Sequence, residues 1–423
     1  MTIRQIITAV ITLALALPAL APRAQGIVPE RRDSKGNEEL GWLIAPAPIK
    51  VEGIGEAVPV FALLSNFYET TDLTSGYTLP GGDIEARFIF IRDFPLLTRH
   101  IMLSAARFHA KMPFRLFNRG IDSDPEDYVQ RLVRYNGGDF KVRLNFWKER
   151  IEFFHQESNI ENTTLAIYDK DGNLLSNNPT TDSYLSRVYG VQLDLTDDPL
   201  DPRRGVHVGR KILPRKSEFD IISDTQTVDT SLSLYFPMFG KDTLVFNAFR
   251  SRSTITRSGV TDEATARIIM DQGCDIAQPS YDACKAAEDK LVGEFLAYNR
   301  HGLATPLGGE SRLRAYPLAR FSAGNSSFYG LEYRLNFADR PVDINLLMLG
   351  GVRTLLQMAF FYEQGTVNDD AGKLGTGMKP SYGIGFRALI SGFIYRMDIA
   401  RGEEGSSVNV LFDYPMKLTP MTE

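Results

Sequence analysis

The sequence predicts an all-β fold, a transmembrane antiparallel β-barrel, and three observations lead to this prediction. The chain of 423 residues begins with an apolar segment that resembles an export signal. Beyond it, no run approaches the roughly 18–20 apolar residues that a membrane helix needs. Apolar and polar residues then alternate with a period of two, which places each set on one side of a sheet.

Residues 1–21 are predicted to be a signal peptide. Arg4 supplies a short positive start, residues 6–20 (IITAVITLALALPAL) form the apolar segment, and Ala19-Leu20-Ala21 places small residues at the cleavage site. This combination is typical of a secretory signal rather than of a membrane span. Cleavage after Ala24 and an uncleaved anchor are the alternatives.

The remaining chain divides into three predicted parts. Residues 22–41 are expected to be a polar linker, because their composition is typical of disordered segments. Residues 42–414 are assigned to the barrel and residues 415–423 to a C-terminal tail. Within the barrel, residues 329–337 (YGLEYRLNF) show the alternation clearly, with aromatic and aliphatic side chains on one face and Gly, Glu, Arg and Asn on the other.

Three details favour a membrane barrel over a soluble β-protein. The apolar faces are rich in Phe and Tyr, as an aromatic girdle at the membrane interface would be. Many alternating runs reach nine residues or more, which matches a tilted membrane strand. The opposite faces carry full charges in mid-strand, which suits a polar lumen. These mid-strand charges are Arg143, Arg334, Arg387 and Arg396.

The period-two runs predict roughly fourteen to sixteen strands, within the range known for such barrels. The predicted strands are 57–64, 85–92, 101–110, 139–147, 151–157, 184–195, 205–213, 227–236, 243–251, 327–337, 342–352, 357–366, 382–390, 393–400 and 407–414, with further strands expected within 111–136 and 314–322. Closing the barrel is expected to pair 57–64 with 407–414.

Residues 261–301 break the alternation and predict a helix-loop-helix. Cys274 and Cys284 lie at its centre, and in an exported protein this spacing predicts a disulfide that closes a small loop. Two free thiols are the alternative, and the spacing does not suit a zinc site. Long excursions in such barrels are extracellular, so this helical loop is expected outside the cell.

Several motifs in the second half of the chain follow one another in a recognisable order. The first is residues 308–321 (GGESRLRAYPLARF), in which Leu313, Arg314 and Tyr316 match a G-x-x-x-(V/L/I)-R-G-(Y/F) loop and Ala315 replaces its second glycine. The later motifs are 330–334 (GLEYR), 361–365 (FYEQG), 382–387 (YGIGFR) and 396–398 (RMD). In order and spacing they resemble the BamA/TamA-type family of outer-membrane barrels, also called the bacterial surface antigen family.

The resemblance implies sixteen strands and a loop that folds back into the lumen. A buried guanidinium needs a carboxylate partner, so Arg314 is expected to pair with at least one of three inward acids. These acids are Glu332, Glu363 and Asp398. In this interpretation Arg314 is structural and fixes the loop. The alternative is an ordinary surface arginine on a mobile loop.

The resemblance also frames the expected function. Family members that insert or secrete proteins carry periplasmic POTRA modules, and these are expected to be absent here, since only a short segment precedes Trp42. The expectation is an assembly or translocation-type barrel in the outer membrane of a Gram-negative bacterium, assisting protein or lipid insertion. A passive pore or structural barrel is one alternative and a barrel enzyme is another.

The composition and motifs also bear on cofactors and partners. No G-x-S-x-G or H-E-x-x-H motif is present, so no enzyme and no cofactor is expected. The net charge of −5 gives no basic surplus that would favour nucleic acid. The expected partners are outer-membrane lipid and either a separate periplasmic protein or outer-membrane protein clients.

Overall fold

The structure is a computed structural model. It describes residues 28–32, 40–68, 71–96, 98–177, 179–271, 273–274, 276, 281–337, 342–346, 349–390 and 393–418. The predicted signal peptide, residues 1–21, lies outside the described residues, as do 22–27 and 33–39 of the predicted linker.

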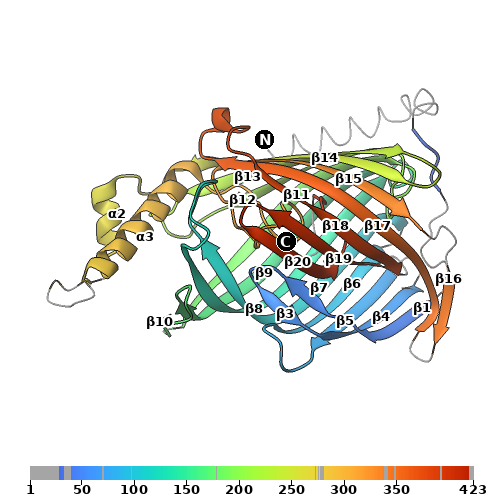
Figure 1. Cartoon of the computed structure of the whole chain (residues 1–423), viewed down its shortest axis with the longest axis horizontal. Coiled ribbons are helices and arrows are strands. Elements are labelled where there is room, and N and C mark those ends of the chain that lie inside the picture. Colours follow the sequence, from blue (N-terminus) through green and yellow to red (C-terminus); the bar gives the residue numbers. More distant parts are fainter. Residues whose placement is uncertain are drawn as a thin grey trace.

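In the described part of the chain, twenty strands join one antiparallel sheet (Figure 1). They are β1 (Gly41–Pro46), β2 (Ile49–Val51), β3 (Gly55–Ala57), β4 (Pro59–Tyr68), β5 (Thr71–Thr78), β6 (Glu85–Leu96), β7 (Thr98–Phe117), β8 (Tyr128–Phe146), β9 (Ile151–Tyr168), β10 (Leu174–Ser176), β11 (Thr180–Thr196), β12 (Gly205–Arg215), β13 (Asp224–Pro237), β14 (Thr243–Arg257), β15 (Asn325–Asn336), β16 (Val342–Leu346), β17 (Leu349–Asn368), β18 (Lys379–Ile390), β19 (Phe393–Gly402) and β20 (Gly405–Phe412).

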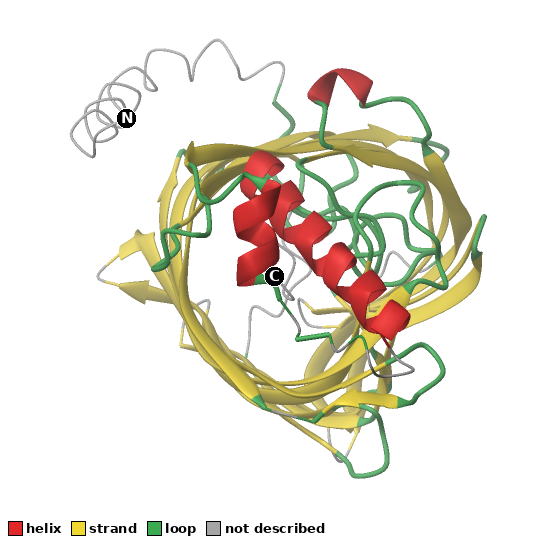
Figure 2. Cartoon of the chain, turned by 90° about the vertical axis from the view of Figure 1, so that its left-hand side faces the viewer, coloured by secondary structure: helices red, strands yellow, loops and turns green. Residues whose placement is uncertain are grey.

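The sheet curves round on itself, as Figure 2 shows, and we call the space inside the curve the lumen. The period-two alternation decides which side chains face it. On β15, for example, Tyr329 and Leu331 point outward and are 47% and 45% exposed. Glu332, the next residue after Leu331, points inward and is fully buried. On this strand the exposed outward side chains are apolar and the buried inward ones include charges, the reverse of a soluble protein.

The two ends of the sheet meet through the short N-terminal strands, and here the predicted pairing of 57–64 with 407–414 is wrong. β4 pairs with β1 along six residue pairs, and β1 in turn pairs with β17 at Trp42↔Gly350 and Leu43↔Leu349. β20 meets β2 at Lys50↔Val410. The short strands β1 and β2, which precede β4, thus lie between β4 and the C-terminal strands. They occupy this place because their extended backbone N–H and C=O groups also need hydrogen-bond partners.

Three other strand predictions also need correction. The predicted strand 342–352 is two antiparallel strands, β16 and the start of β17, because a continuous apolar run has no alternation from which to place a turn. Residues 314–322 form no strand and enter the lumen instead. β5 was not predicted, since its sequence TDLTSGYT is polar and has no apolar face.

The helix-loop-helix prediction matches α2 (Glu263–Ile269) and α3 (Tyr281–His301). Asp262 caps α2 by accepting a hydrogen bond from the Thr265 backbone N–H at 2.8 Å. α3 crosses one opening of the curved sheet (Figure 2), and we call this the helix end. No helix in the described ranges is both long and apolar enough to cross a membrane.

The predicted disulfide falls partly outside the described residues. Cys274 lies between the two helices, and Cys284 belongs to α3, but the side chain of Cys284 is not among those described. The bridge between them therefore stays a prediction.

Candidate functional site

The chain between α3 and β15 folds into the lumen, and we call residues 302–324 the lumen loop. Leu307 and Phe321 form a two-residue antiparallel bridge at its base, with both N–H···O distances at 2.9 Å. Leu313 and Tyr316 are fully buried. These side chains form one apolar cluster with inward residues of the sheet, so the loop has a packed core of its own inside the lumen.

Glycines on the wall let the lumen loop approach closely. A Cβ at Gly365 of β17 would lie 2.8 Å from Leu307 and 3.0 Å from Leu313. A Cβ at Gly402 would lie 2.8 Å from the Tyr316 ring. The Tyr316 hydroxyl donates to the Pro380 carbonyl at 3.0 Å, which fixes the ring against the wall.

The alanine that replaces the motif's second glycine is not strained. Positive φ is found at Leu313 (φ 55°) and Ala319 (φ 55°), but not at Ala315. The Ala315 N–H donates to the Ser381 hydroxyl at 3.1 Å. The substitution therefore leaves the loop geometry intact, and the strain sits one residue before Arg314, where a left-handed leucine costs about 1–2 kcal/mol.

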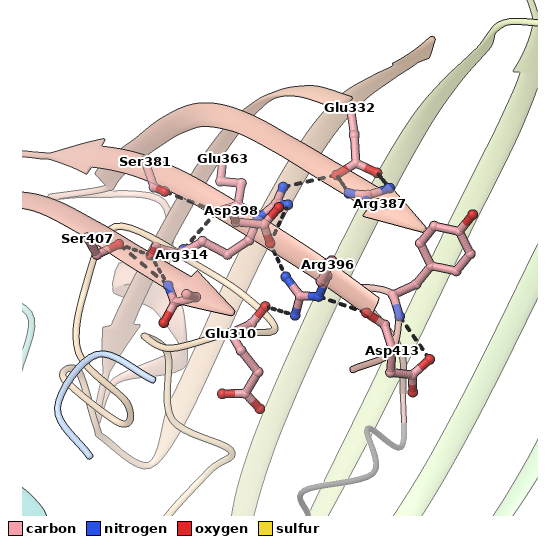
Figure 3. Close-up of polar contacts among 12 residues, drawn as sticks. Glu310, Arg314, Glu332, Glu363, Ser381, Arg387, Arg396, Asp398, Ser407 and Asp413 are labelled. Carbon is pink, nitrogen blue, oxygen red and sulfur yellow. Dashed lines mark hydrogen bonds and ion pairs between the residues drawn. The ribbon is translucent and has the colours of Figure 1, made fainter. Parts of the chain in front are cut away.

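Arg314 is fully buried and the structure brings all three candidate acids to it (Figure 3). Its guanidinium lies 2.8 Å from Glu363 of β17, 3.1 Å from Glu332 of β15 and 3.4 Å from Asp398 of β19. The guanidinium carbon also lies 3.4 Å from the centroid of the Phe361 ring. Three separate strands are therefore tied to one side chain.

The three acids differ in how many other cations they contact. Glu332 also pairs with Arg387, at 2.9 Å, and with Arg334, at 2.8 Å. Asp398 also pairs with Arg396. Glu363 otherwise accepts a hydrogen bond from Ser381 at 3.1 Å and from the Arg314 backbone N–H at 2.9 Å.

It follows that Glu363 depends most on Arg314. Among the described residues, Arg314 is the one cation that forms an ion pair with Glu363. The seven charged groups of this cluster, three acids and four arginines, are at most 3% exposed. They are Arg314, Glu332, Arg334, Glu363, Arg387, Arg396 and Asp398.

The backbone of Arg314 ties the loop to the last strand as well. Its carbonyl accepts hydrogen bonds from Ser407, at 2.6 Å, and from Asn409, at 3.0 Å, both on β20. Further along the loop, the Leu318 N–H donates to the carbonyl of Glu52 at 2.9 Å. The lumen loop thus contacts both sides of the junction between the ends of the sheet.

The G-x-G motif on β18 has a direct physical role. A Cβ at Gly385 would lie 2.3 Å from Asp398 Oδ1, and a Cβ at Gly383 would lie 2.0 Å from the Ile399 carbonyl and 2.7 Å from Phe361. Real Cβ atoms do not approach so closely, so only glycine lets the charged and aromatic side chains of the neighbouring strands lie across β18.

The C-terminal tail was predicted only as a polar tail, and its described part folds into the lumen. Tyr414 is buried, and the faces of Arg334 and Arg387 lie 4.3 and 5.1 Å from its ring centroid. Met416 and Leu418, 5% and 3% exposed, join the apolar cluster of the lumen loop. The signal available in the sequence was the alternation of apolar Met416 and Leu418 with Lys417, directly after Pro415.

Other anchors of the lumen loop were not predicted. Arg320 is fully buried and pairs with Glu404 at 2.8 Å, and it also donates to the Ser123 hydroxyl at 2.8 Å. The Arg312 guanidinium donates to the carbonyl of Lys417 at 2.6 Å. A single arginine in a loop carries no sequence signal for its partner, because these partners are 84 to 197 residues away in the chain.

At the end opposite α3, part of the predicted linker is docked. Arg31 pairs with Asp194 at 2.9 Å and Arg32 with Asp197 at 2.7 Å. Arg150 donates to the Pro29 carbonyl at 2.6 Å. Residues 28–32 are therefore held against the turn between β11 and β12, where four aspartates gather.

The arrangement can hold the strands and the lumen loop together through charge. Each of the seven charged side chains forms at least one ion pair. Four of their buried polar atoms have no hydrogen-bond partner among the described residues, namely Nη1 of Arg314, Nη1 of Arg334, Nε of Arg387 and Oδ1 of Asp398. The described residues contain no group of three or more His, Cys, Asp or Glu that could hold a metal ion. A network of buried ion pairs favours one arrangement of the groups around it.

Comparisons with known proteins give structural neighbours without a family. No known protein family matches the sequence, and no curated protein matches it. BamA from Haemophilus ducreyi lacking POTRA domains 1–3 is 10% identical with a TM-score of 0.46, over 89% of this chain and 69% of that protein.

Two CdiB structures are similar to the same degree. CdiB from Acinetobacter baumannii is 9% identical with a TM-score of 0.45, over 88% of this chain and 59% of that protein. CdiB from Escherichia coli is 9% identical with a TM-score of 0.46, over 88% and 66%. The chain thus spans about two thirds of the length of these proteins, and the TM-scores assign it to no family.

Proposed function

We propose that the chain is a closed transmembrane barrel of a Gram-negative outer membrane. The observation that supports this is the inversion of burial around the sheet. Outward residues of β17 and β18 such as Phe360, Tyr362 and Phe386 are 44–47% exposed. Glu363 and Arg387, which directly follow Tyr362 and Phe386, are 0% and 2% exposed. Burying such charges while exposing aromatics is favourable only where lipid surrounds the sheet.

The count of sixteen strands fits this proposal. Four of the twenty strands in the described ranges, β2, β3, β10 and β16, have five residues or fewer. Sixteen remain (20 − 4), the even number that the resemblance implies. We place the helix end, with its predicted disulfide, outside the cell and residues 28–32 on the periplasmic side.

We propose that this barrel assists the insertion or translocation of proteins or lipids by parting where the ends of its sheet meet. We call this place the junction. Among the described residues, it is held by two residue pairs between β1 and β17 and by one between β2 and β20. By comparison, β7 and β8 share seventeen pairs. Within the described part of the sheet, few hydrogen bonds join its two ends, so we propose that the sheet separates there.

The test is to lock the junction. Cysteines at Trp42 and Gly350, which face each other in the register, should form a crosslink after oxidation. Vesicles that contain the barrel should speed the insertion of an unfolded outer-membrane protein, and the crosslink should abolish that acceleration. A matched crosslink between Ala105 and Phe140, which pair on β7 and β8, should leave it unchanged.

A passive pore is the second candidate, and one observation favours it. The lumen loop packs on the C-terminal half of the sheet, whereas inward charges of β8 and β9 remain reachable by water. The Arg143 and Glu152 side chains are 20% and 17% exposed. Ion conductance by the pure barrel, together with no effect on client insertion, would favour the pore and contradict the insertion proposal.

We propose that the chain is not an enzyme and needs no cofactor, because each side chain of its densest ionisable group is buried and forms at least one ion pair. We also propose that Cys274 and Cys284 are bridged. Thiol labelling of intact cells should then succeed only after reduction, and labelling without a reductant would contradict the bridge. We also propose a protein partner, either a separate periplasmic protein or outer-membrane protein clients. Crosslinking in native membranes followed by purification of the barrel should recover it.

A further inference from the structure

Basic side chains gather on the outward face of β6, β7 and β8, and we call Arg87, Arg107, Lys111 and Arg134 the first basic patch. The register places them on one face, because residues directly opposite each other in an antiparallel pair share a face. Arg107 opposes Ile89, which is 47% exposed, and Lys111 opposes Arg134. The patch therefore points away from the lumen.

The first basic patch borders the apolar band at the helix end. On β8, Phe140 and Leu144 are exposed on the same face as Arg134 and continue toward the opposite end of the sheet. Arg119, two residues after β7, donates its backbone N–H to Glu294 of α3 at 3.0 Å. The basic residues thus lie between the apolar band and the helix end.

Among the described residues, Glu85 is the one acid that forms an ion pair with the first basic patch, and its charge also acts on Arg134. Lys111 pairs with Glu85 at 2.8 Å. No ion pair joins Arg87, Arg107 or Arg134 to an acid among the residues that the structure describes. Moreover, Lys111 and Arg134 stand directly opposite each other, and like charges in that position destabilise a sheet.

The shape of the patch suits a ligand that lies flat on the sheet. Gly138 opposes Arg107, and the Arg107 guanidinium reaches to 3.9 Å from the position that a Cβ of Gly138 would occupy. Gly138 therefore leaves room for this guanidinium to lie over β8, the strand that also carries Arg134. Guanidinium groups bind phosphate oxygens with two parallel hydrogen bonds.

A second basic patch repeats the arrangement on another part of the sheet. Arg210 of β12 and Arg250 of β14 flank Thr230 of β13 in one cross-strand row, and Arg252 follows two residues later on the same face. All three arginines are exposed, and none has an acidic partner within the described ranges. β14 leads into α2, so this patch also lies toward the helix end.

We propose that the two basic patches bind the phosphate groups of anionic lipids in the leaflet on the helix side. This inference rests on the proposed membrane barrel. Basic residues beside an apolar band attract anionic headgroups, and each contributes a factor of about five in lipid binding. The lipid phosphates neutralise arginines that form no ion pair with any described residue, and they relieve the repulsion between Lys111 and Arg134.

The test measures which lipids stay with the barrel. The mature chain is reconstituted in phosphatidylcholine vesicles with a minor fraction of lipid A that carries two phosphates. After extraction, native mass spectrometry counts the lipid A retained per barrel. We expect Arg87→Gln, Arg107→Gln and Arg134→Gln together to lower retention by up to about a hundredfold, the product of three such factors.

The matched control removes equal charge at the other end of the strands, with Arg99→Gln, Lys148→Gln and Arg204→Gln, and should retain lipid A normally. Dephosphorylated lipid A with the same acyl chains should be retained poorly by the unaltered barrel. Equal retention of both lipids, or equal loss in the control, would overturn the proposal. A basic patch that instead captures an acidic protein would show the same lipid retention before and after the substitutions.

Each vesicle sample is first assayed for the folded barrel by its faster migration on gels before heating. A barrel that inserts but shows no preference for phosphate refutes the lipid inference alone. A chain that never inserts refutes the proposed membrane barrel.

Discussion

Arg314→Ala removes the side chain that joins three strands of the sheet to the lumen loop. After the substitution, Glu332 retains Arg334 and Arg387, and Asp398 retains Arg396. Glu363 loses its guanidinium partner and keeps one hydroxyl and one backbone N–H. The main consequence is therefore one buried carboxylate without a counter-ion.

The expected magnitude follows from that consequence. Removing one partner of a buried ion pair costs about 3–5 kcal/mol, because the remaining charge is left uncompensated. Glu363→Gln combined with Arg314→Ala should recover part of the loss, since the uncompensated charge is then gone. We expect a coupling energy of roughly 2–3 kcal/mol between Arg314 and Glu363, and a smaller one between Arg314 and Glu332.

The assay is urea unfolding in lipid vesicles, followed by the fraction of barrel that migrates as folded on unheated gels. The midpoint and slope give the free energy of unfolding for each variant. Arg204→Ala, at an exposed arginine in the turn before β12, is the control and should change it by less than about 0.5 kcal/mol. Strict additivity of Arg314→Ala and Glu363→Gln would refute the pairing and the structural role of the loop.

Three further predictions concern other contacts of the lumen. Gly385→Ala should destabilise the barrel by at least about 1–3 kcal/mol through overpacking, whereas Gly293→Ala, where a Cβ meets nothing within 4 Å in α3, should raise the urea midpoint. Leu418→Ala should cost about 2–5 kcal/mol and admit larger solutes in a vesicle-swelling assay; unchanged swelling and stability would contradict the packed tail. Burial raises the pKa of Asp369, but the hydrogen bonds from Arg119 outweigh this and hold it below its ordinary value. The Arg119–Asp369 contact therefore stabilises the fold fully above about pH 4, and this stabilisation is lost as the pH falls through the lowered pKa of Asp369. Limited proteolysis of the segment around Asp369 at pH values between 3 and 7 would detect the loss. Arg119→Ala should abolish this pH dependence.

The sequence was most informative where the alternation was strong. The predicted strands 184–195, 205–213, 227–236, 327–337, 382–390, 393–400 and 407–414 were located to within a few residues, because inward charges and outward aromatics recur there at every second position. The predictions 139–147 and 151–157 each missed about half of a longer strand, β8 and β9. Arg314 and its acids could be proposed together because their motifs follow a known order. The junction was predicted incorrectly, since the pairing of 57–64 with 407–414 ignored the backbone groups of residues 41–51.

The remaining parts of the site depend on contacts that no local pattern encodes. Met416 enters the lumen because Asp413 and Met416 itself adopt positive φ, 80° and 66°, which turns the chain inward after β20. Methionine does not signal such a conformation in advance, and aspartate, although enriched at positive φ, adopts it at only a minority of its positions. Glu363 likewise depends on Arg314 because Arg334 and Arg387 pair with Glu332 and not with Glu363, which no local pattern predicts.

The most direct test of the membrane barrel is a cysteine scan along β8 in reconstituted vesicles. Single cysteines at positions 140–144 carry a fluorophore, and quenching by brominated lipid is compared with quenching by aqueous iodide. Probes at Phe140, Val142 and Leu144 should be quenched by lipid, and probes at Lys141 and Arg143, which face the lumen, by iodide. Iodide quenching of all five positions, with no alternation, would contradict a sheet that spans the membrane.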